Sequence, residues 1–478
     1  GTGAPFSLSA RERERLGAVL RRALRRARRA GRPTLATLSL ALPGDVDPTA
    51  VACASRREGE HWFCFEQPER GRRALAGLGA AVAIESAGPQ RFADVARRWR
   101  ELSARAVEDA GAAAGRGGPV AFGGFAFAPQ GSSSPQWAGF APASLVVPEV
   151  LLARAERDGA VVARITLAAL ASADDDEEEL LARLCARADE LVARPLPLLD
   201  PAPAGTSRVV SAMPPEHYEA AVARAVELIG AGELEKIVLA REVHVHAPQP
   251  HDPAAIVSVL REEFPSCFCF CVGRGDATFV AASPELLLRR EGHRVSTLAL
   301  AGSMRRSADP AIDAHLGEQL LREEAYREEH AIVARRIERM LRAHSIWVAA
   351  APEPVIVKIA NIQHLATPIR AQMSRPLDAL ELAALMHPTP AVGGEPLERA
   401  APLIPALEGL DRGWYLGPLG WVDSNGDGEF CVALRCALLR GPVARCFAGG
   451  GIVREADPAA ELAETEIKLA ALLPLLAG

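Results

Sequence analysis

Two glutamates and a lysine near the end of the chain have the spacing of one helix face. No glycine or proline interrupts residues 459–473, so this stretch predicts a helix. At helical spacing Glu461, Glu464 and Lys468 lie three and four residues apart and share one side. Carboxylates one turn apart repel each other unless a cation lies between them or both face water. The segment alone therefore allows either a cation site or a solvated helix surface.

Three further side chains could take part in acid–base chemistry. Lys236 precedes an apolar run, where partial desolvation makes an amine a usable base. Glu285 follows Ser283–Pro284 in an apolar segment, where a carboxyl group can keep its proton and act as an acid. Glu329 lies beside His330 on a predicted helix, and by itself it would be an ordinary surface carboxylate.

An arginine near the C-terminus has room for a ligand beside it. Arg435 lies on a predicted strand, 431–438, with Ala433 and Ala437 next to it on the same side. The other side, residues 432, 434, 436 and 438, is apolar and should face the core. A guanidinium in such a place can hold a carboxylate through two parallel hydrogen bonds, although a structural ion pair would explain it equally well.

Two glycine-containing segments are candidate anion sites. Gly302–Ser303 and Gly449–Gly451 both follow apolar strands, which predicts turns with exposed backbone N–H groups. Such groups can bind an anion, but most turns of this kind are only turns.

These pieces belong to a series of blocks that resemble the chorismate-utilising enzymes and, within that family, the isochorismate synthases. The blocks run in family order from about Ser207 to the end: Glu235-Lys-Ile-Val-Leu-Ala-Arg241, Ala282-Ser-Pro-Glu-Leu-Leu-Leu288, Leu300-Ala-Gly-Ser303, Glu329-His330, His364-Leu-Ala-Thr-Pro368, His387-Pro-Thr-Pro-Ala391, Phe447-Ala-Gly-Gly-Gly-Ile452 and Glu461-x-x-Glu464-Thr-x-x-Lys468. A looser likeness covers Trp62–Gly71 and Pro119–Phe127.

The resemblance implies a reaction and its catalytic groups. Chorismate would become isochorismate when water adds at ring carbon 2 and the hydroxyl on carbon 4 leaves. By resemblance, Lys236 would deprotonate the water, Glu285 would protonate the leaving hydroxyl, and His364 would hydrogen-bond near that hydroxyl. The implied substrate contacts for its carboxylates and ring are Gly302, Ser303, Ala391, Tyr415, Arg435, Gly449 and Lys468.

The resemblance also implies a magnesium ion. Glu329 and Glu464 would bind Mg²⁺, with Glu461 supporting it through water, and few protein ligands suit this ion. The family often has an acidic residue three positions before the first of these glutamates, on the same helix face. Here that position is Tyr326. We therefore expect weaker Mg²⁺ binding than in a relative with the acid.

Several alternatives to isochorismate synthesis are open at this point. Anthranilate and aminodeoxychorismate synthases look similar, but they use ammonia and usually pair with a glutaminase subunit. Anthranilate synthases carry glutamine where this chain has Lys236, a residue that suits water as the nucleophile, so no glutaminase subunit is expected. Salicylate synthases share the lysine and also eliminate pyruvate, which makes them the main alternative. A homologue that kept the fold but lost catalysis is a third possibility. The pathway could be menaquinone or siderophore synthesis, and the N-terminal likeness favours menaquinone slightly.

The elements that must position these residues predict an α+β fold. Strands are expected at 62–66, 82–84, 120–127, 145–152, 236–246, 267–271, 277–290, 294–301, 414–423 and 429–439, and helices at 7–32, 92–110, 177–193, 215–231, 253–264 and 311–343. Ser424–Gly428 is a good hairpin turn. We expect two large, mostly antiparallel sheets packed face to face with helices outside. Residues 1–195 should complete the sheets, 196–206 form a proline-rich linker, and 207–478 form the catalytic region.

Composition excludes several classes of protein. The 478 residues carry a net charge of -6, which argues against a nucleic-acid-binding protein despite the arginine-rich segment 7–32. The nine cysteines lack metal-site spacing, and Cys267, Cys269 and Cys271 predict a strand buried on both faces. We find no signal-peptide pattern and no run long enough to span a membrane. The expectation is a cytoplasmic enzyme that acts alone, as a monomer.

Overall fold

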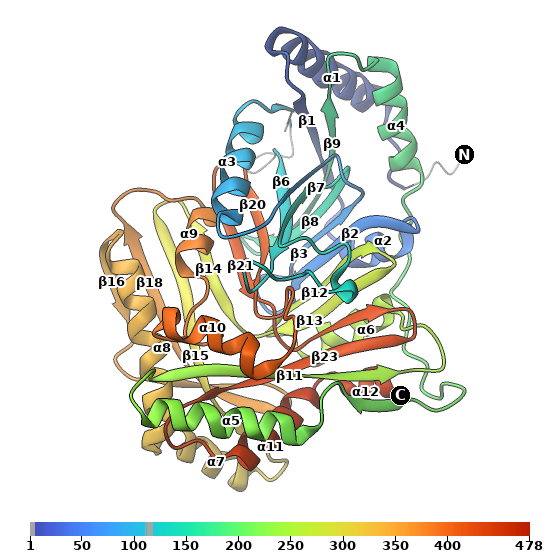
Figure 1. The fold of residues 1–478 in the computed structure, drawn as a ribbon. Helices are drawn as coiled ribbons and strands as arrows, with labels where there is room; N and C mark the ends of the chain where they lie inside the picture. Colours follow the sequence, from blue (N-terminus) through green and yellow to red (C-terminus); the bar gives the residue numbers. More distant parts are fainter. Residues whose placement is uncertain (1–4, 110, 112–117) are drawn as a thin grey trace.

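Two large β-sheets with helices around them make up the computed structural model, which describes residues 5–109, 111 and 118–478 (Figure 1). Within these residues the first sheet has thirteen strands: β10 (Arg208–Ser211), β11 (Lys236–His246), β23 (Val443–Ile452), β22 (Cys436–Arg440), β13 (Ala277–Ser283), β12 (Phe268–Gly275), β2 (Gly59–Gln67), β3 (Arg73–Leu78), β8 (Val150–Arg157), β9 (Ala160–Ala171), β1 (Thr34–Leu42) and β5 (Val107–Asp109), with β19 (Gly394–Glu395) beside β11.

The second sheet has ten strands in the described part of the chain. Their order is β16 (Ser345–Ala350), β18 (Ile362–Met373), β15 (Arg294–Arg305), β14 (Leu286–Glu291), β21 (Gly428–Val432), β20 (Pro418–Asp423), β6 (Val120–Phe125), β7 (Ala143–Val147) and β4 (Val82–Ser86), with β17 (Val355–Lys358) beside β18. Apart from the parallel pair β1–β5, the pairs are antiparallel. The predicted α+β class is confirmed.

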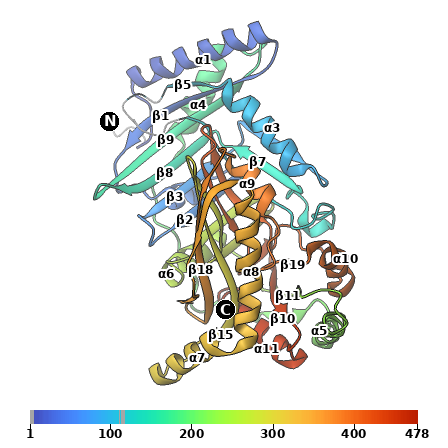
Figure 2. The ribbon, with the colours of Figure 1, turned by 90° about the vertical axis from the view of Figure 1, so that its left-hand side faces the viewer.

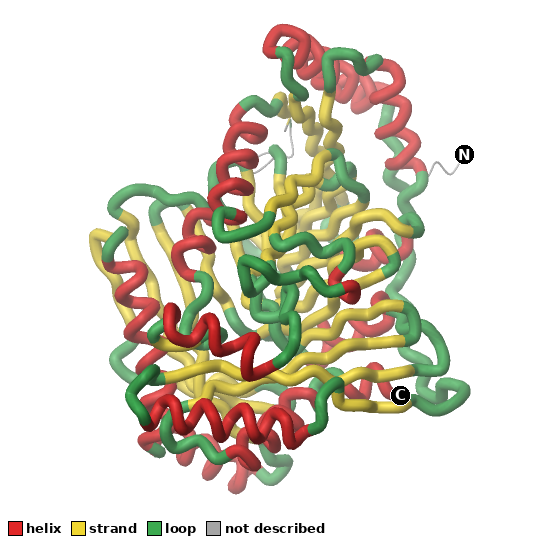
Figure 3. Tube along the Cα trace, viewed as in Figure 1, coloured by secondary structure: helices red, strands yellow, loops and turns green. Residues whose placement is uncertain are grey.

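Helices lie around the outside of the strands (Figure 3). They are α1 (Ala10–Ala30), α2 (Pro48–Ser55), α3 (Arg91–Ala104), α4 (Glu177–Asp189), α5 (Pro215–Gly230), α6 (Pro253–Glu263), α7 (Pro310–Arg322), α8 (Glu324–Arg342), α9 (Ala379–Met386), α10 (Leu397–Glu408), α11 (Pro458–Leu469) and α12 (Leu473–Ala477). In the turned view α8 runs along β15 and β18 (Figure 2). None of the described helices combines the length and the apolar character that a membrane span requires.

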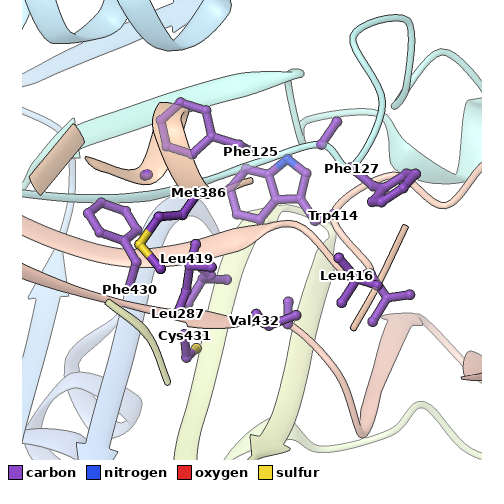
Figure 4. Close-up of a cluster of buried hydrophobic side chains, with 14 of the residues drawn as sticks. Phe125, Phe127, Leu287, Met386, Trp414, Leu416, Leu419, Phe430, Cys431 and Val432 are labelled. Atoms are coloured by element: carbon purple, nitrogen blue, oxygen red, sulfur yellow. The ribbon is translucent and has the colours of Figure 1, made fainter. Parts of the chain in front are cut away.

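The inner faces of the two sheets form the core. Phe63 on β2 stacks on Phe122 on β6, with ring centroids 4.0 Å apart. Trp414 packs into the same core near Phe125 and Phe430 (Figure 4). Burial of these aromatic rings contributes a large part of the free energy that stabilises the contact between the two sheets.

Both sheets contain strands from the two sides of the proline-rich segment. In the first sheet β2 pairs with β12, and in the second β6 pairs with β20. Residues 192–207, which include the proline-rich segment, have no regular helix or strand and are mostly exposed.

Three stretches that we predicted as single strands are each two strands, and the two halves belong to different sheets. Residues 145–152 divide into β7 and β8, 277–290 into β13 and β14, and 429–439 into β21 and β22. Pro148 and Pro284 interrupt the first two, because proline cannot donate to the strand ladder. The third break falls at Arg435, whose φ of 50° is left-handed. Apolar residues lie on both sides of all three breaks, and the single-strand prediction was wrong there.

Other boundaries also differ from expectation. The predicted helix 311–343 is interrupted at Glu323, which has extended backbone between α7 and α8. The predicted helix 92–110 ends at Ala104, and its final residue, Ala110, lies outside the described residues. The helix expected over 459–473 ends at Leu469, after which α12 begins a new short helix. The buried cysteine strand and the hairpin between β20 and β21 were predicted correctly.

Candidate active site

A cavity between the two sheets contains almost all of the predicted site residues. Its lining comes from β11 and β23 of the first sheet, β15 and β18 of the second, α8, α11 and the segments where strands change sheets. The cavity encloses about 650 Å³ including its mouth. The predicted residues on its wall are Lys236, Glu285, Gly302, Ser303, Glu329, His364, Ala391, Tyr415, Arg435, Gly449, Glu464 and Lys468. Glu461 is the exception and is not part of the lining.

Lys236 is a buried amine at the start of β11. Its side chain is 1% exposed, and Nζ lies 3.4 Å from Glu329 Oε1. Burial lowers the pKa of the Lys236 amine, and the Glu329 charge opposes that shift. Glycine on the neighbouring strand leaves room for these side-chain ends in their present positions, since a Cβ at Gly451 would lie 2.6 Å from Lys236 Cε and still closer to Glu329 Oε1. The geometry keeps the amine desolvated next to a carboxylate.

Glu285 lies where β13 of the first sheet passes into β14 of the second. It is 5% exposed, and burial raises the pKa of its carboxyl group to about 8, although the charges of Lys236, Arg435 and Lys468 oppose the shift. Its backbone is fixed because the Val432 N–H donates to the Glu285 carbonyl over 3.0 Å. A carboxyl group in this state is protonated at neutral pH and can donate a proton.

Arg435 lies on the second connection between the sheets, directly beside the first. The Ala282 N–H donates to the Arg435 carbonyl over 3.1 Å, so the two connections hold each other in place. The predicted strand faces were wrong here: Leu434 lines the cavity instead of the core, because the chain leaves β21 before reaching it. Burial lowers the pKa of the Arg435 guanidinium, whose nearby hydrogen-bond partner is His364.

His364 on β18 bridges two other predicted residues. Arg435 Nη2 lies 2.9 Å from His364 Nε2, and Ser303 Oγ lies 3.0 Å from His364 Nδ1. Ser303 faces His364 because β15 has an irregularity between Leu300 and Ser303, where Gly302 takes a φ of 90°. Gly302 and Ser303 therefore lie inside a strand, and the predicted turn was wrong.

The glycines at 449–451 also lie within a strand, β23, and not in a turn. One edge of this part of β23 pairs with β11, while β22 reaches only as far as Cys446 on the other edge. Lys468 Nζ donates to the Gly449 carbonyl over 2.7 Å on this uncovered side. The backbone groups that a turn was expected to provide come instead from a strand edge that faces the cavity.

Three carboxylates gather at the α8–α11 side of the cavity. Lys468 Nζ lies 3.0 Å from Glu464 Oε1, and Lys236 Nζ lies 3.4 Å from Glu329 Oε1. Burial raises the pKa of Glu461 to about 9, with the charges of Glu464 and Glu329 adding to the shift. Burial likewise raises the pKa of Glu329, and the Glu464 charge adds to it. The carboxylates are close enough to repel one another.

The oxygen atoms of these carboxylates are the possible ligands of a cation. In the described ranges no three histidine, cysteine, aspartate or glutamate side chains are gathered tightly enough to form a metal site by themselves. However, Glu461 Oε2 is buried without a hydrogen-bond partner, and the donors are all carboxylate oxygens, which Mg²⁺ prefers. A Mg²⁺ ion that keeps most of its waters needs few protein ligands. The residues therefore fit such an ion.

Tyr326 lies on the same side of α8 as Glu329 and faces this group of carboxylates. Burial raises the pKa of its phenol to about 12, and the charges of Glu323, Glu464, Glu461 and Glu329 add to the shift. The tyrosine hydroxyl thus occupies the position from which an additional carboxylate could reach the same group of carboxylates.

An apolar wall completes the cavity, and of its residues only Tyr415 was predicted as a substrate contact. The Tyr415 ring stacks on Phe447 with centroids 5.0 Å apart, and Leu416 and Leu434 lie nearby on the lining. Leu416 has a φ of 66° and is fixed by its N–H, which donates to the Ala433 carbonyl. A flat ring with anionic groups suits this combination of apolar wall, guanidinium and amines.

Comparisons with known proteins find similar sequences over most of this chain. A family model described as "Chorismate binding enzyme" matches residues 22–477. The "Salicylate biosynthesis isochorismate synthase" of Pseudomonas aeruginosa is 35% identical over 468 residues, which covers 97% of this chain and 94% of the relative. "Isochorismate synthase MenF" of Bacillus subtilis is 32% identical over 430 residues, 89% of each chain.

A solved structure is also similar over nearly the whole chain. The structure of MenF, the menaquinone-specific isochorismate synthase from Escherichia coli, has a TM-score of 0.77 at 25% identity and covers 96% of this chain and all of that one. The resemblance inferred from the sequence blocks is confirmed. This chain belongs to the family of chorismate-binding enzymes.

Proposed function

We propose that the protein is an isochorismate synthase, which converts chorismate to isochorismate with Mg²⁺. The observation that carries the proposal is the pair Lys236 and Glu285: one cavity holds a desolvated amine and a carboxyl group that keeps its proton. The full-length relatives that carry the name isochorismate synthase support the same reaction.

The two groups supply the two proton transfers that the reaction needs. Lys236, as the neutral amine, takes a proton from the water that adds at carbon 2 of the ring. Glu285 gives its proton to the hydroxyl that leaves carbon 4. Proton transfer by positioned side chains typically accelerates a step by about a hundred- to ten-thousandfold each.

The remaining lining residues bind and orient the substrate. Arg435 and Lys468 offer cationic donors for the enolpyruvyl carboxylate, and Tyr415 and Phe447 form the wall against which the ring lies. Glu329 and Glu464 would hold Mg²⁺, with Glu461 linked through water. When bound, the ion supplies the positive charge that holds the ring carboxylate.

Incubation with chorismate and Mg²⁺ tests the proposal. Isochorismate as the product supports it. Salicylate together with pyruvate would assign the chain to the salicylate synthases instead, and no turnover would indicate a homologue that only binds. Liquid chromatography with mass detection separates these products.

The product would feed either menaquinone or siderophore synthesis. The relatives include one named for salicylate biosynthesis and one structure named for menaquinone. Deletion of the gene, followed by measurement of the quinone and of secreted iron chelators, distinguishes the two pathways.

A further inference from the structure

The His364 ring has a partner on each of its nitrogens, and together these partners fix where its proton lies. Arg435 Nη2 is 2.9 Å from Nε2. A guanidinium can only donate, so Nε2 must be the acceptor. The ring proton is then on Nδ1, which donates to Ser303 Oγ at 3.0 Å. The contacts therefore select one neutral tautomer of His364.

A second proton on this ring would be strongly unfavourable. His364 is 4% exposed, so water cannot compensate a new charge there. The charged groups that face it are Arg435, from the connection between the sheets, and Lys468, from α11. Burial and these two cations lower the pKa of His364 well below its usual range, although a hydrogen bond with the Gly302 backbone opposes the shift. The imidazole is thus an acceptor and not a proton source.

Arg435 is the donor to this acceptor nitrogen. Its backbone is left-handed at the break between β21 and β22, so the side chain leaves from an irregular segment and not from a regular strand. Among the described residues no acidic side chain forms an ion pair with it. His364 gives the guanidinium one neutral partner and leaves its charge for an anionic ligand.

We propose that His364 and Ser303 are positioning residues, which hold the Arg435 guanidinium in place for a carboxylate of the substrate. This deepens the proposed function, since it rests on chorismate binding in the same cavity. It also assigns His364 a different task from the contact near the leaving hydroxyl that the family resemblance implies. The chain Ser303–His364–Arg435 orients a cation, and Glu285 is left as the proton donor.

Two substitutions at His364 test the idea as a matched pair. In His364→Gln the amide oxygen can still accept from Arg435, whereas His364→Leu cannot accept at all. We expect His364→Leu to raise the KM for chorismate about ten- to hundredfold, because a hydrogen bond to a charged group is lost, with a smaller change in kcat. His364→Gln should stay within about threefold of the wild type in both constants. Thermal melting checks that both variants are folded.

An equal loss of kcat in the two His364 variants would overturn the proposal, because that outcome indicates proton transfer by the imidazole.

Ser303 provides a second comparison. Ser303→Thr keeps the hydroxyl and should preserve KM, while Ser303→Ala should raise it several-fold. A Ser303→Ala variant with unchanged KM would remove Ser303 from the positioning chain.

A spectroscopic readout is independent of turnover. In protein labelled with ¹⁵N-histidine, His364 should show a protonated Nδ1 and an unprotonated Nε2 that do not change from about pH 6 to about pH 9. A proton on Nε2, or a titration within this range, would refute the assignment. If the wild type does not turn over chorismate, the proposed function fails, and the NMR result still decides the tautomer.

Discussion

At the scale of single residues, burial alone prepares the two proposed proton-transfer groups. The same desolvation lowers the pKa of the Lys236 amine and raises that of the Glu285 carboxyl group. Each group is thereby driven toward its neutral form, the amine as a base and the carboxyl as an acid. The two roles need opposite protonation states, and burial in one cavity supplies both.

This gives a pH prediction for Glu285. Its pKa of about 8 means that the acid is present below that pH and is lost as pH rises through it, so kcat/KM should fall above about pH 8. Glu285→Gln should lower kcat by about a hundred- to ten-thousandfold and remove this alkaline decline. The exposed Glu455→Gln is the control and should behave as the wild type. A decline that persists unchanged in Glu285→Gln would contradict the assignment.

Tyr326 gives a prediction about the metal. Tyr326→Asp adds a carboxylate beside Glu329 and Glu464, and it should tighten Mg²⁺ binding on the order of tenfold. Tyr326→Phe is the matched control, because it changes the same position without adding charge, and it should bind Mg²⁺ as the wild type does. Calorimetric titration with MgCl₂ measures both. An unchanged affinity in Tyr326→Asp would show that the position does not face the ion.

At the scale of elements, the site depends on how closely β23 passes β11. Gly451→Ala would bring a methyl group into Glu329 and Lys236. We expect kcat to fall on the order of a hundredfold, because a catalytic group displaced by about 1 Å loses its geometry. Gly230→Ala at the end of α5, where a Cβ meets nothing within 4 Å, is the control. Steady-state kinetics with thermal melting should show full activity for the control, and full activity for Gly451→Ala would mean that Lys236 can relax without cost.

The connections between sheets are the other important elements. Glu285 and Arg435 lie where β13 passes into β14 and where β21 passes into β22, and backbone hydrogen bonds join these two places. A regular strand alternates its side chains between two faces, whereas a chain that changes sheets can direct a side chain into the space between them. The proposed acid and the proposed carboxylate-binding arginine both use this geometry.

At the scale of the whole molecule, strands from both sides of the proline-rich segment share each sheet. The pairs β2–β12 and β6–β20 cross this boundary, and Phe63 and Phe122 join the sheets beside them. We predict that cleavage at a protease site placed in residues 196–206 leaves two fragments that co-elute in size-exclusion chromatography and keep activity. Residues 207–478 expressed alone should aggregate, because the β12 and β20 edges would be unpaired. Fragments that separate under native conditions would instead indicate independent domains.

Much of this protein could be predicted from local sequence. The bounds of β11 were predicted correctly, because its hydrophobic run and flanking residues are local signals. The residues that line the cavity were identified by resemblance, because their blocks are short and contiguous in the chain. Leu416 and Leu434 were missed since an apolar residue that lines a cavity has the same local pattern as one in the core.

The sequence by itself determined which side chains could carry charge or a proton, and which stretches are apolar enough to bury them. Only the tertiary structure decided that stretches predicted as single strands divide between two sheets, and that His364 meets Arg435 from 71 positions away. The physical reason is that hydrophobic periodicity indicates which residues are buried but not which segments they pack against. The choice of sheet and the neighbours of each buried group depend on packing between segments far apart in the chain.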